Sequence, residues 1–174
     1  RTGREFFSDL AVAHMQMLQQ GEGSVTLVQA NVAIASNAAG MEQQLLRGCL
    51  VAAYIHTAGV LADRLLASQH VADSRAVFAP KVAGLSSASQ LLQHQPLRQL
   101  LLFSSISAAL GNRGQGNYAA ANAAMDAAAV ALAGSGRAAC SLQWGAWEGA
   151  GMAAQTPELL ARLRTQGECG VACM

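Results

Sequence analysis

A chain of 174 residues is long enough for one compact domain and leaves little room for a second. Hydrophobic residues make up 52% of it and charged residues only 12%, which predicts a packed core and argues against disorder. A net charge of +1 gives no electrostatic basis for binding nucleic acid or an acidic membrane surface. No apolar run reaches the roughly 20 residues of a transmembrane helix, and no signal-peptide pattern follows Arg1, so a soluble, cytoplasmic chain is expected.

Four cysteines in a chain of this size do not form a disulfide scaffold. Cys49 and Cys140 have apolar neighbours, whereas Cys169 and Cys173 lie four residues apart near the end. We interpret them as two buried thiols and two tail thiols. A metal site at the second pair is the weaker alternative, because no histidine or further cysteine is nearby, and no metal is expected.

The first part of the chain alternates between helical and extended patterns. Residues 8–20 have helical spacing and end at Gly21, residues 24–29 suit a strand, and residues 41–47 suit a second helix. Residues 50–55 form a nearly continuous apolar run, as expected of a strand buried on both faces of a parallel sheet.

The second part continues the alternation. Residues 73–94 have helical spacing, with a kink or break expected at Pro80. The remaining elements are expected as a strand at 100–103, an alanine-rich helix at 118–132, a strand at 139–144 and a helix opening at 156–159. Strands that alternate with helices of this length predict an α/β fold with a Rossmann-like, doubly wound parallel sheet.

Ligands of open parallel sheets bind beyond the carboxyl ends of the strands. Polar or small residues follow the predicted strands at 56–59, at 104–105 and at 144–145. Tyr118 and Asn122 lie four apart on one helix and therefore share a face, and the returning helix could bring Tyr118 towards Ser105. Taken singly, such a tyrosine is more often a packing residue and such serines are more often turn formers.

Taken together, these stretches closely resemble the short-chain dehydrogenase/reductase superfamily and, within it, the ketoreductase domains of polyketide synthases. The resemblance runs from about Arg1 to Met152. It rests on His-Thr-Ala-Gly-Val at 56–60, Val-Phe-Ala-Pro-Lys-Val-Ala-Gly at 77–84, Phe-Ser-Ser at 103–105, Asn-Tyr-Ala-Ala-Ala-Asn-Ala at 117–123 and Trp-Gly-Ala-Trp at 144–147.

The resemblance implies NADPH-dependent reduction of a β-ketoacyl thioester carried on an acyl carrier protein, within a polyketide synthase whose other domains are further partners. It implies that Tyr118 donates the proton, that Ser105 hydrogen-bonds the substrate carbonyl, and that Lys81 and Asn122 support them. Lys81 is expected to favour the phenolate and so to bring the pKa of Tyr118 down towards the working range. His56 is interpreted as a structural histidine with no chemical role.

The same resemblance implies cofactor-binding and substrate-binding residues. The cofactor is expected to meet Arg1, at the 2′-phosphate, together with Asn31, Val32, Thr57, Ala58 and Gly59. Asp63, Asn117, Trp147 and Met152 are implied in substrate placement or stereocontrol, although a buried aromatic corner is the alternative for the Trp144–Trp147 stretch. Asp63 and the absence of Trp at position 110 predict a D-configured alcohol.

Several features depart from the family pattern. Asn31 replaces a common Asp, Ala62 replaces the first Asp of a Leu-Asp-Asp motif, and Arg113 stands where Pro is frequent. No glycine-rich phosphate turn precedes the first helix, and the glycines at 111–116 lie in the wrong place for one.

Residues 1–174 are therefore expected to be a partial ketoreductase domain whose sheet is incomplete at both ends, with a gap between the strands at 25–29 and 50–55. Alone, the chain is expected to bind NADPH weakly and to be inactive. The alternative is a noncatalytic structural or interaction remnant.

Overall fold

The computed structural model describes residues 28, 30–34, 49–146 and 161. Its centre is a parallel sheet in the order β1 (Ala53–His56), β2 (Gln99–Ser105) and β3 (Ala139–Trp144). In the register of the sheet Tyr54 lies opposite Leu100, and Leu100 lies opposite Ala139. All three strands therefore end at the same edge of the sheet, where loops can bring side chains together.

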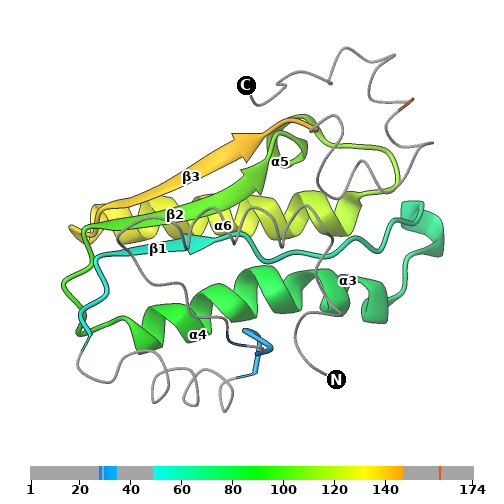
Figure 1. The fold of residues 1–174 in the computed structure, drawn as a ribbon. Helices are drawn as coiled ribbons and strands as arrows, with labels where there is room; N and C mark the ends of the chain where they lie inside the picture. Colours follow the sequence, from blue (N-terminus) through cyan, green and yellow to red (C-terminus); the bar gives the residue numbers. More distant parts are fainter. Residues whose placement is uncertain (1–27, 29, 35–48, 147–160, 162–174) are drawn as a thin grey trace.

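Helical segments connect the strands (Figure 1). After β1 come η2 (Leu66–Ser68), α3 (Val71–Phe78), the π-helical turn η3 (Ala79–Ala83) and α4 (Gly84–Leu91); after β2 come α5 (Ser107–Leu110) and α6 (Gly116–Gly134). The turn η3 contains Pro80, which has no backbone N–H to continue an α-helical ladder. The expected break at Pro80 is thus present as a π turn within an otherwise nearly continuous helix.

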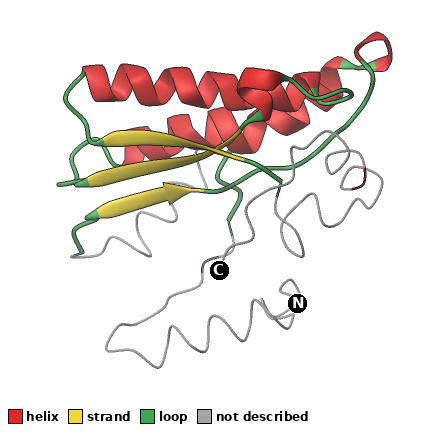
Figure 2. Cartoon of the chain, turned by 90° about the horizontal axis from the view of Figure 1, so that it is seen from above, coloured by secondary structure: helices red, strands yellow, loops and turns green. Residues whose placement is uncertain are grey.

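The helices described here lie on one face of the sheet (Figure 2). The main core cluster joins α4, β2 and α6 and consists of Leu85, Leu100, Leu102, Met125 and Ala129. Alanine is the strongest helix former and its short side chain lets α6 approach the sheet closely. The helix is therefore held against β2 and β3, with its first turn at the carboxyl edge.

Most predicted elements in the described ranges are confirmed. The strand at 139–144 has the predicted bounds, β2 is longer than predicted at both ends, and β1 starts later than predicted. The long helix begins at Val71 instead of residue 73 and ends near Leu91. The short elements η2 and α5 were not predicted, because three or four residues carry too little periodicity. The helices expected at 8–20, 41–47 and 156–159, and the strand at 24–29 apart from residue 28, lie outside the described residues.

Two burial predictions are wrong. Ile55 of β1 is 57% exposed, because the described helices pack on the other side of the sheet. Cys49 and Cys140 are both free and exposed rather than buried. Cys49 precedes β1. Cys140 lies in β3, and its side chain points to the face of the sheet opposite α6, because its neighbour Ala139 packs against the core on the α6 side. None of the helices within the described residues is long and apolar enough to cross a membrane.

Candidate active site

Ser105 and Tyr118 meet at the carboxyl edge of the sheet. Ser105 ends β2, and Tyr118 lies in the first turn of α6. The loop between them reverses the chain through Gly111 and Gly114, whose φ angles of 73° and 85° are in the left-handed region that glycine adopts without strain. Tyr118 is buried, and the side chains of Ser105 and Asn122 lie close enough to its hydroxyl to act on its pKa. The predicted approach of Tyr118 to Ser105 is confirmed.

Burial sets the acidity of the tyrosine. Desolvation raises the pKa of Tyr118 above its ordinary value of 10.0, and the neighbouring Asn122 and Ser105 side chains offset part of that rise. The expectation that Lys81 brings this pKa down is therefore wrong in this structure: burial outweighs the favourable contacts. Tyr118 is protonated at neutral pH, which is the state a proton donor requires.

Lys81 is the single lysine in the sequence, and the other ten basic residues are arginines. It lies in η3 with only 2% of its surface exposed. Its Nζ donates to the Phe103 carbonyl oxygen at 3.2 Å and lies 5.3 Å from the centre of the Tyr118 ring. Desolvation lowers the pKa of Lys81 from 10.5 to about 8. The ammonium is therefore largely protonated at pH 7 and held beside the phenol.

Asn122 lies one turn after Tyr118 on α6. Its Nδ2 donates to the Tyr118 carbonyl oxygen at 2.9 Å, which confirms that the two residues share a face of α6. The Ser104 hydroxyl lies 3.5 Å from the Asn122 carbonyl oxygen and links β2 to the same turn. Within the described residues the buried Asn122 Oδ1 has no hydrogen-bond partner, so it can accept a further donor at this site.

A carboxylate lies further along the same helix. Asp126 accepts hydrogen bonds from Ser141 Oγ at 2.6 Å and from Gln143 Nε2 at 2.8 Å, which fasten α6 to β3. Its negative charge acts against desolvation and raises the pKa of Lys81. Asp126 thus helps to keep the buried ammonium charged.

The loop at residues 61–64, which carries the shortened Leu-Asp-Asp motif, is tied to the turn before α6. Asp63 Oδ2 accepts from Gln115 Nε2 at 2.8 Å, and the Ala62 carbonyl oxygen accepts from Asn117 Nδ2 at 2.9 Å. Asn117 Oδ1 in turn accepts the Tyr118 backbone N–H at 2.8 Å. The Ala62 side chain is missing the family's carboxylate, but its backbone oxygen still connects the loop to the turn.

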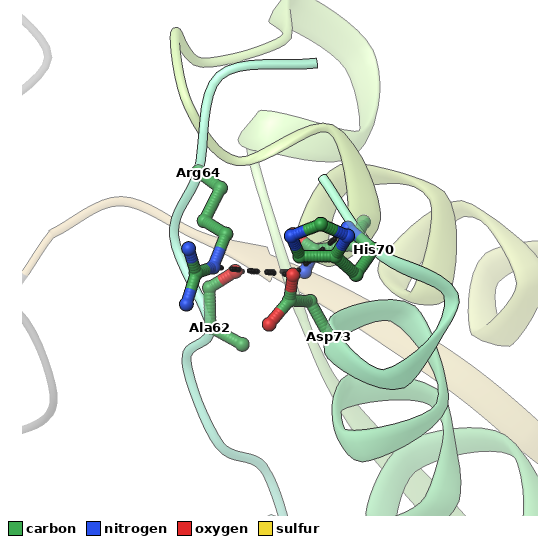
Figure 3. A network of polar contacts seen from close by, with 5 residues as sticks. Ala62, Arg64, His70 and Asp73 are labelled. Carbon is green, nitrogen blue, oxygen red and sulfur yellow. Dashed lines mark hydrogen bonds and ion pairs between the residues drawn. The ribbon is translucent and has the colours of Figure 1, made fainter. Parts of the chain in front are cut away.

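A second link fastens this loop to α3 (Figure 3). Arg64 Nε lies 3.2 Å from Asp73 Oδ2, and the His70 backbone N–H donates to the same oxygen at 2.9 Å. Asp73 sits in the first turn of α3, where a carboxylate also interacts favourably with the helix dipole. The 61–64 loop is therefore fixed on two sides.

Apart from Arg1, the predicted cofactor-binding residues lie in two described segments. Thr57, Ala58 and Gly59 directly follow β1 at the carboxyl edge. Val32 belongs to the segment 30–34, and its Cγ2 lies 2.9 Å from the point where a Cβ on Gly84 would stand. Asn31 is exposed, and its Oδ1 accepts the Ala33 N–H at 3.0 Å.

Three predicted site residues, Arg1, Trp147 and Met152, lie outside the described residues. Trp144 at the end of β3 packs against Phe103, with 5.4 Å between the ring centres, but both side chains are half-buried rather than buried.

Sequence reasoning missed the partners of these residues. Asp126 was detectable in principle, because it follows Tyr118 by eight residues and Asn122 by four and so shares their helical face. Gln115 pairs with a residue 52 positions away, for which a single sequence carries no signal.

The parallel sheet, with Ser105, Tyr118, Lys81 and Asn122 gathered at its carboxyl edge, defines a short-chain dehydrogenase/reductase. The sequence matches the KR domain family over residues 2–149. The chain belongs to this family, the ketoreductase domains of polyketide synthases.

Similar proteins include a 6-methylsalicylic acid synthase of Arthrobotrys oligospora, 34% identical over 161 residues, which cover 91% of this chain and 9% of the synthase. A spectinabilin polyketide synthase protein of Streptomyces orinoci is 43% identical over 99 residues, covering 57% of this chain and 5% of that protein.

Among solved structures, an A-type ketoreductase from a modular polyketide synthase superimposes with a TM-score of 0.85 at 32% identity, covering 96% of this chain and 34% of that one. A ketoreductase domain from the bacillaene assembly line superimposes with a TM-score of 0.79 at 29% identity, covering 92% of this chain and 40% of that one. The chain thus spans about a third of the solved ketoreductases that it resembles.

Proposed function

We propose that this chain, over residues 1–174, provides the catalytic part of a domain that reduces a β-ketoacyl thioester on an acyl carrier protein to the β-hydroxyacyl thioester. The observation that carries this proposal is the buried Tyr118, whose hydroxyl is close to the Ser105 and Asn122 side chains and whose ring lies beside the buried Lys81 ammonium. The further domains of a polyketide synthase are the proposed partners.

NADPH is the proposed cofactor. The donor set fits a nicotinamide: small residues at Ala58 and Gly59 allow close approach to the backbone beyond β1, and the buried Asn122 Oδ1 has an unused acceptor site. Val32 and Thr57 are proposed as further cofactor contacts, and Arg1 is proposed for the 2′-phosphate. When bound, the nicotinamide would supply the hydride that adds to the carbonyl carbon of the substrate.

Residues of this chain then stabilise and protonate the carbonyl oxygen of the substrate. As the carbonyl π electrons move onto oxygen, the Ser105 hydroxyl donates a hydrogen bond to it, and the Tyr118 hydroxyl transfers its proton to it. The tyrosine is left as a phenolate, next to the Lys81 ammonium and the Asn122 amide. Both groups stabilise the negative charge that develops on the phenol oxygen as the proton leaves, so they lower the barrier without binding the ketone more tightly.

The configuration of the product is proposed from the 61–64 loop. Asp63, held by Gln115, supports a D-configured alcohol. One of the similar solved structures is an A-type ketoreductase. The D configuration is proposed from Asp63 of this chain and not from that structure.

Replacing Tyr118 by Phe tests the function. In the full-length protein that carries this chain, Y118F should lose about 100-fold or more in reduction of a simple β-ketoacyl thioester while NADPH affinity stays nearly unchanged, because only the proton donor is removed. Val130→Ala, at a 74% exposed position of the same helix, is the matched control. Near wild-type turnover by Y118F would contradict the assignment, and an unmodified protein that binds neither NADPH nor the thioester would favour a noncatalytic remnant.

A further inference from the structure

The buried side chain of His56 is the feature of the fold that the reaction above leaves unused. His56 ends β1 and is only 2% exposed. A buried imidazole needs partners for both ring nitrogens. Both partners are present: the Tyr54 hydroxyl lies 3.1 Å from Nδ1, and the Lys81 carbonyl oxygen lies 3.0 Å from Nε2.

These two contacts fix how the ring is protonated. A carbonyl oxygen can only accept, so Nε2 must carry the hydrogen and donate to Lys81. Nδ1 is then the acceptor, and the Tyr54 hydroxyl donates to it. Desolvation also lowers the pKa of His56, and the groups that face the ring are Tyr54 from its own strand and, from η3, the Pro80 backbone and the backbone and charge of Lys81. The ring is therefore neutral at pH 7 and has a single defined tautomer.

The acceptor lies in the turn where the helix departs from α geometry. In η3 the Gly84 N–H bonds to both Ala79 and Lys81 carbonyl oxygens, so the register of hydrogen bonds is shifted around the lysine. A carbonyl oxygen has two lone pairs, so the Lys81 carbonyl oxygen can accept a second donor from outside the helix. His56 supplies that outside donor from β1, while the Phe103 carbonyl oxygen on β2 holds the ammonium of the same residue.

We propose that His56 is a positioning residue: its Nε2–H holds the Lys81 backbone in the π turn, and thereby fixes the ammonium beside the Tyr118 ring. The consequence for catalysis rests on the proposed function, but the placement of Lys81 does not. Gly84 supports the same arrangement, because a Cβ there would stand 3.2 Å from His56 Cε1. Any larger residue would press on the imidazole.

The test compares two nearly isosteric variants of the full chain. Gln places its Nε2 near the position of the His Nε2 and can still donate to Lys81, whereas the Asn amide is too short to reach. Lys81 is the only lysine in the 174-residue sequence, so a chain labelled with [ε-¹³C]lysine gives one side-chain resonance. The pH titration of that resonance measures the pKa of the Lys81 amine.

We expect H56Q to keep the lysine pKa near the wild-type value of about 8, and H56N to move it upward towards 10.5 as the released ammonium becomes hydrated. His94→Asn, at an exposed histidine, is the matched control and should change nothing. Equal lysine pKa values in H56Q, H56N and wild type would overturn the proposal.

A second readout covers the case in which H56N folds poorly. In the full-length protein, H56Q should keep kcat within a few-fold of wild type. H56N should lower kcat roughly 10-fold to 100-fold with little change in KM, because a displaced lysine affects the transition state and not ketone binding. If H56Q loses as much as H56N, the hydrogen bond is not what matters and the proposal fails. If the lysine pKa moves as expected in a protein with no reductase activity, the positioning role stands and the proposed function fails.

Discussion

Replacing Lys81 by Met should make the protein more stable at neutral pH while removing its activity. Burial lowers the pKa of this lysine from 10.5 to about 8, so the folded state disfavours the charged form. One pKa unit is worth about 1.4 kcal/mol, and the folded protein at pH 7 therefore bears an unfavourable term of about 3 kcal/mol. Met has similar length and no charge, so K81M removes this unfavourable free energy. Part of the gain is offset because K81M also loses the hydrogen bond to the Phe103 carbonyl oxygen.

The sign of the pH dependence distinguishes this explanation from simple repacking. Below about pH 8 the lysine is protonated in both states, and the penalty is fully present. Between pH 8 and 10.5 the unfolded chain binds more protons than the folded one, so wild-type stability rises with pH. The advantage of K81M should consequently shrink by about 2 kcal/mol between pH 7 and pH 9.5.

Urea unfolding of wild type and K81M at these two pH values measures the difference directly. Arg75→Met, at an exposed position of α3, is the matched control and should show no comparable pH dependence. A free energy of unfolding for K81M that is lower than wild type at pH 7, or a difference that is the same at both pH values, would refute the reasoning. Reduction by K81M should be lost in the full-length protein, because the phenolate has no nearby cation.

Further predictions concern packing, stereochemistry and cofactor binding. Gly84→Ala should lower the free energy of unfolding by about 1–3 kcal/mol, because its Cβ would stand 2.9 Å from Val32 Cγ2; an unchanged urea midpoint would contradict this contact. Leu102→Ala, at a fully buried position of β2, should cost about 2–5 kcal/mol in the same assay, and a cost below 1 kcal/mol would show that the core can collapse around it. Chiral chromatography of the product should show a D-configured alcohol, and a mainly L-configured product would rule out the role given to Asp63. Calorimetry should show only weak NADPH binding by the 174-residue chain alone, and micromolar affinity would overturn that expectation.

How far the sequence predicts this site depends on how local each contact is. The pairing of Tyr118 with Asn122 follows from helical spacing and is confirmed. The approach of Ser105 follows from a strand, a glycine-rich reversal and a helix in immediate succession, and it is also confirmed. These features need only short-range pattern and the rule that parallel strands end at one edge.

Contacts between distant segments behave differently. His56 and Lys81 are 25 positions apart, and their hydrogen bond depends on a π turn that no propensity predicts. The interpretation of His56 as a structural histidine agrees with its burial, but the identity of its partner was not accessible from the pattern. The exposure of Cys140 was misjudged for a related reason: apolar neighbours along a strand do not tell which face another element covers.

The buried site at position 81 accommodates the compact ammonium of a lysine better than the guanidinium of an arginine. Arginine carries the positive charge at the other ten basic positions, and it stays protonated at every accessible pH. A guanidinium is planar and would need several acceptors, whereas the described contacts of the buried site are one carbonyl oxygen, at Phe103, and the face of one phenol ring. The compact ammonium of lysine fits that space, and Asp126 keeps it charged against the effect of burial. The fold forgoes stability by burying Lys81, and the same burial places an ammonium where it would stabilise a phenolate at Tyr118.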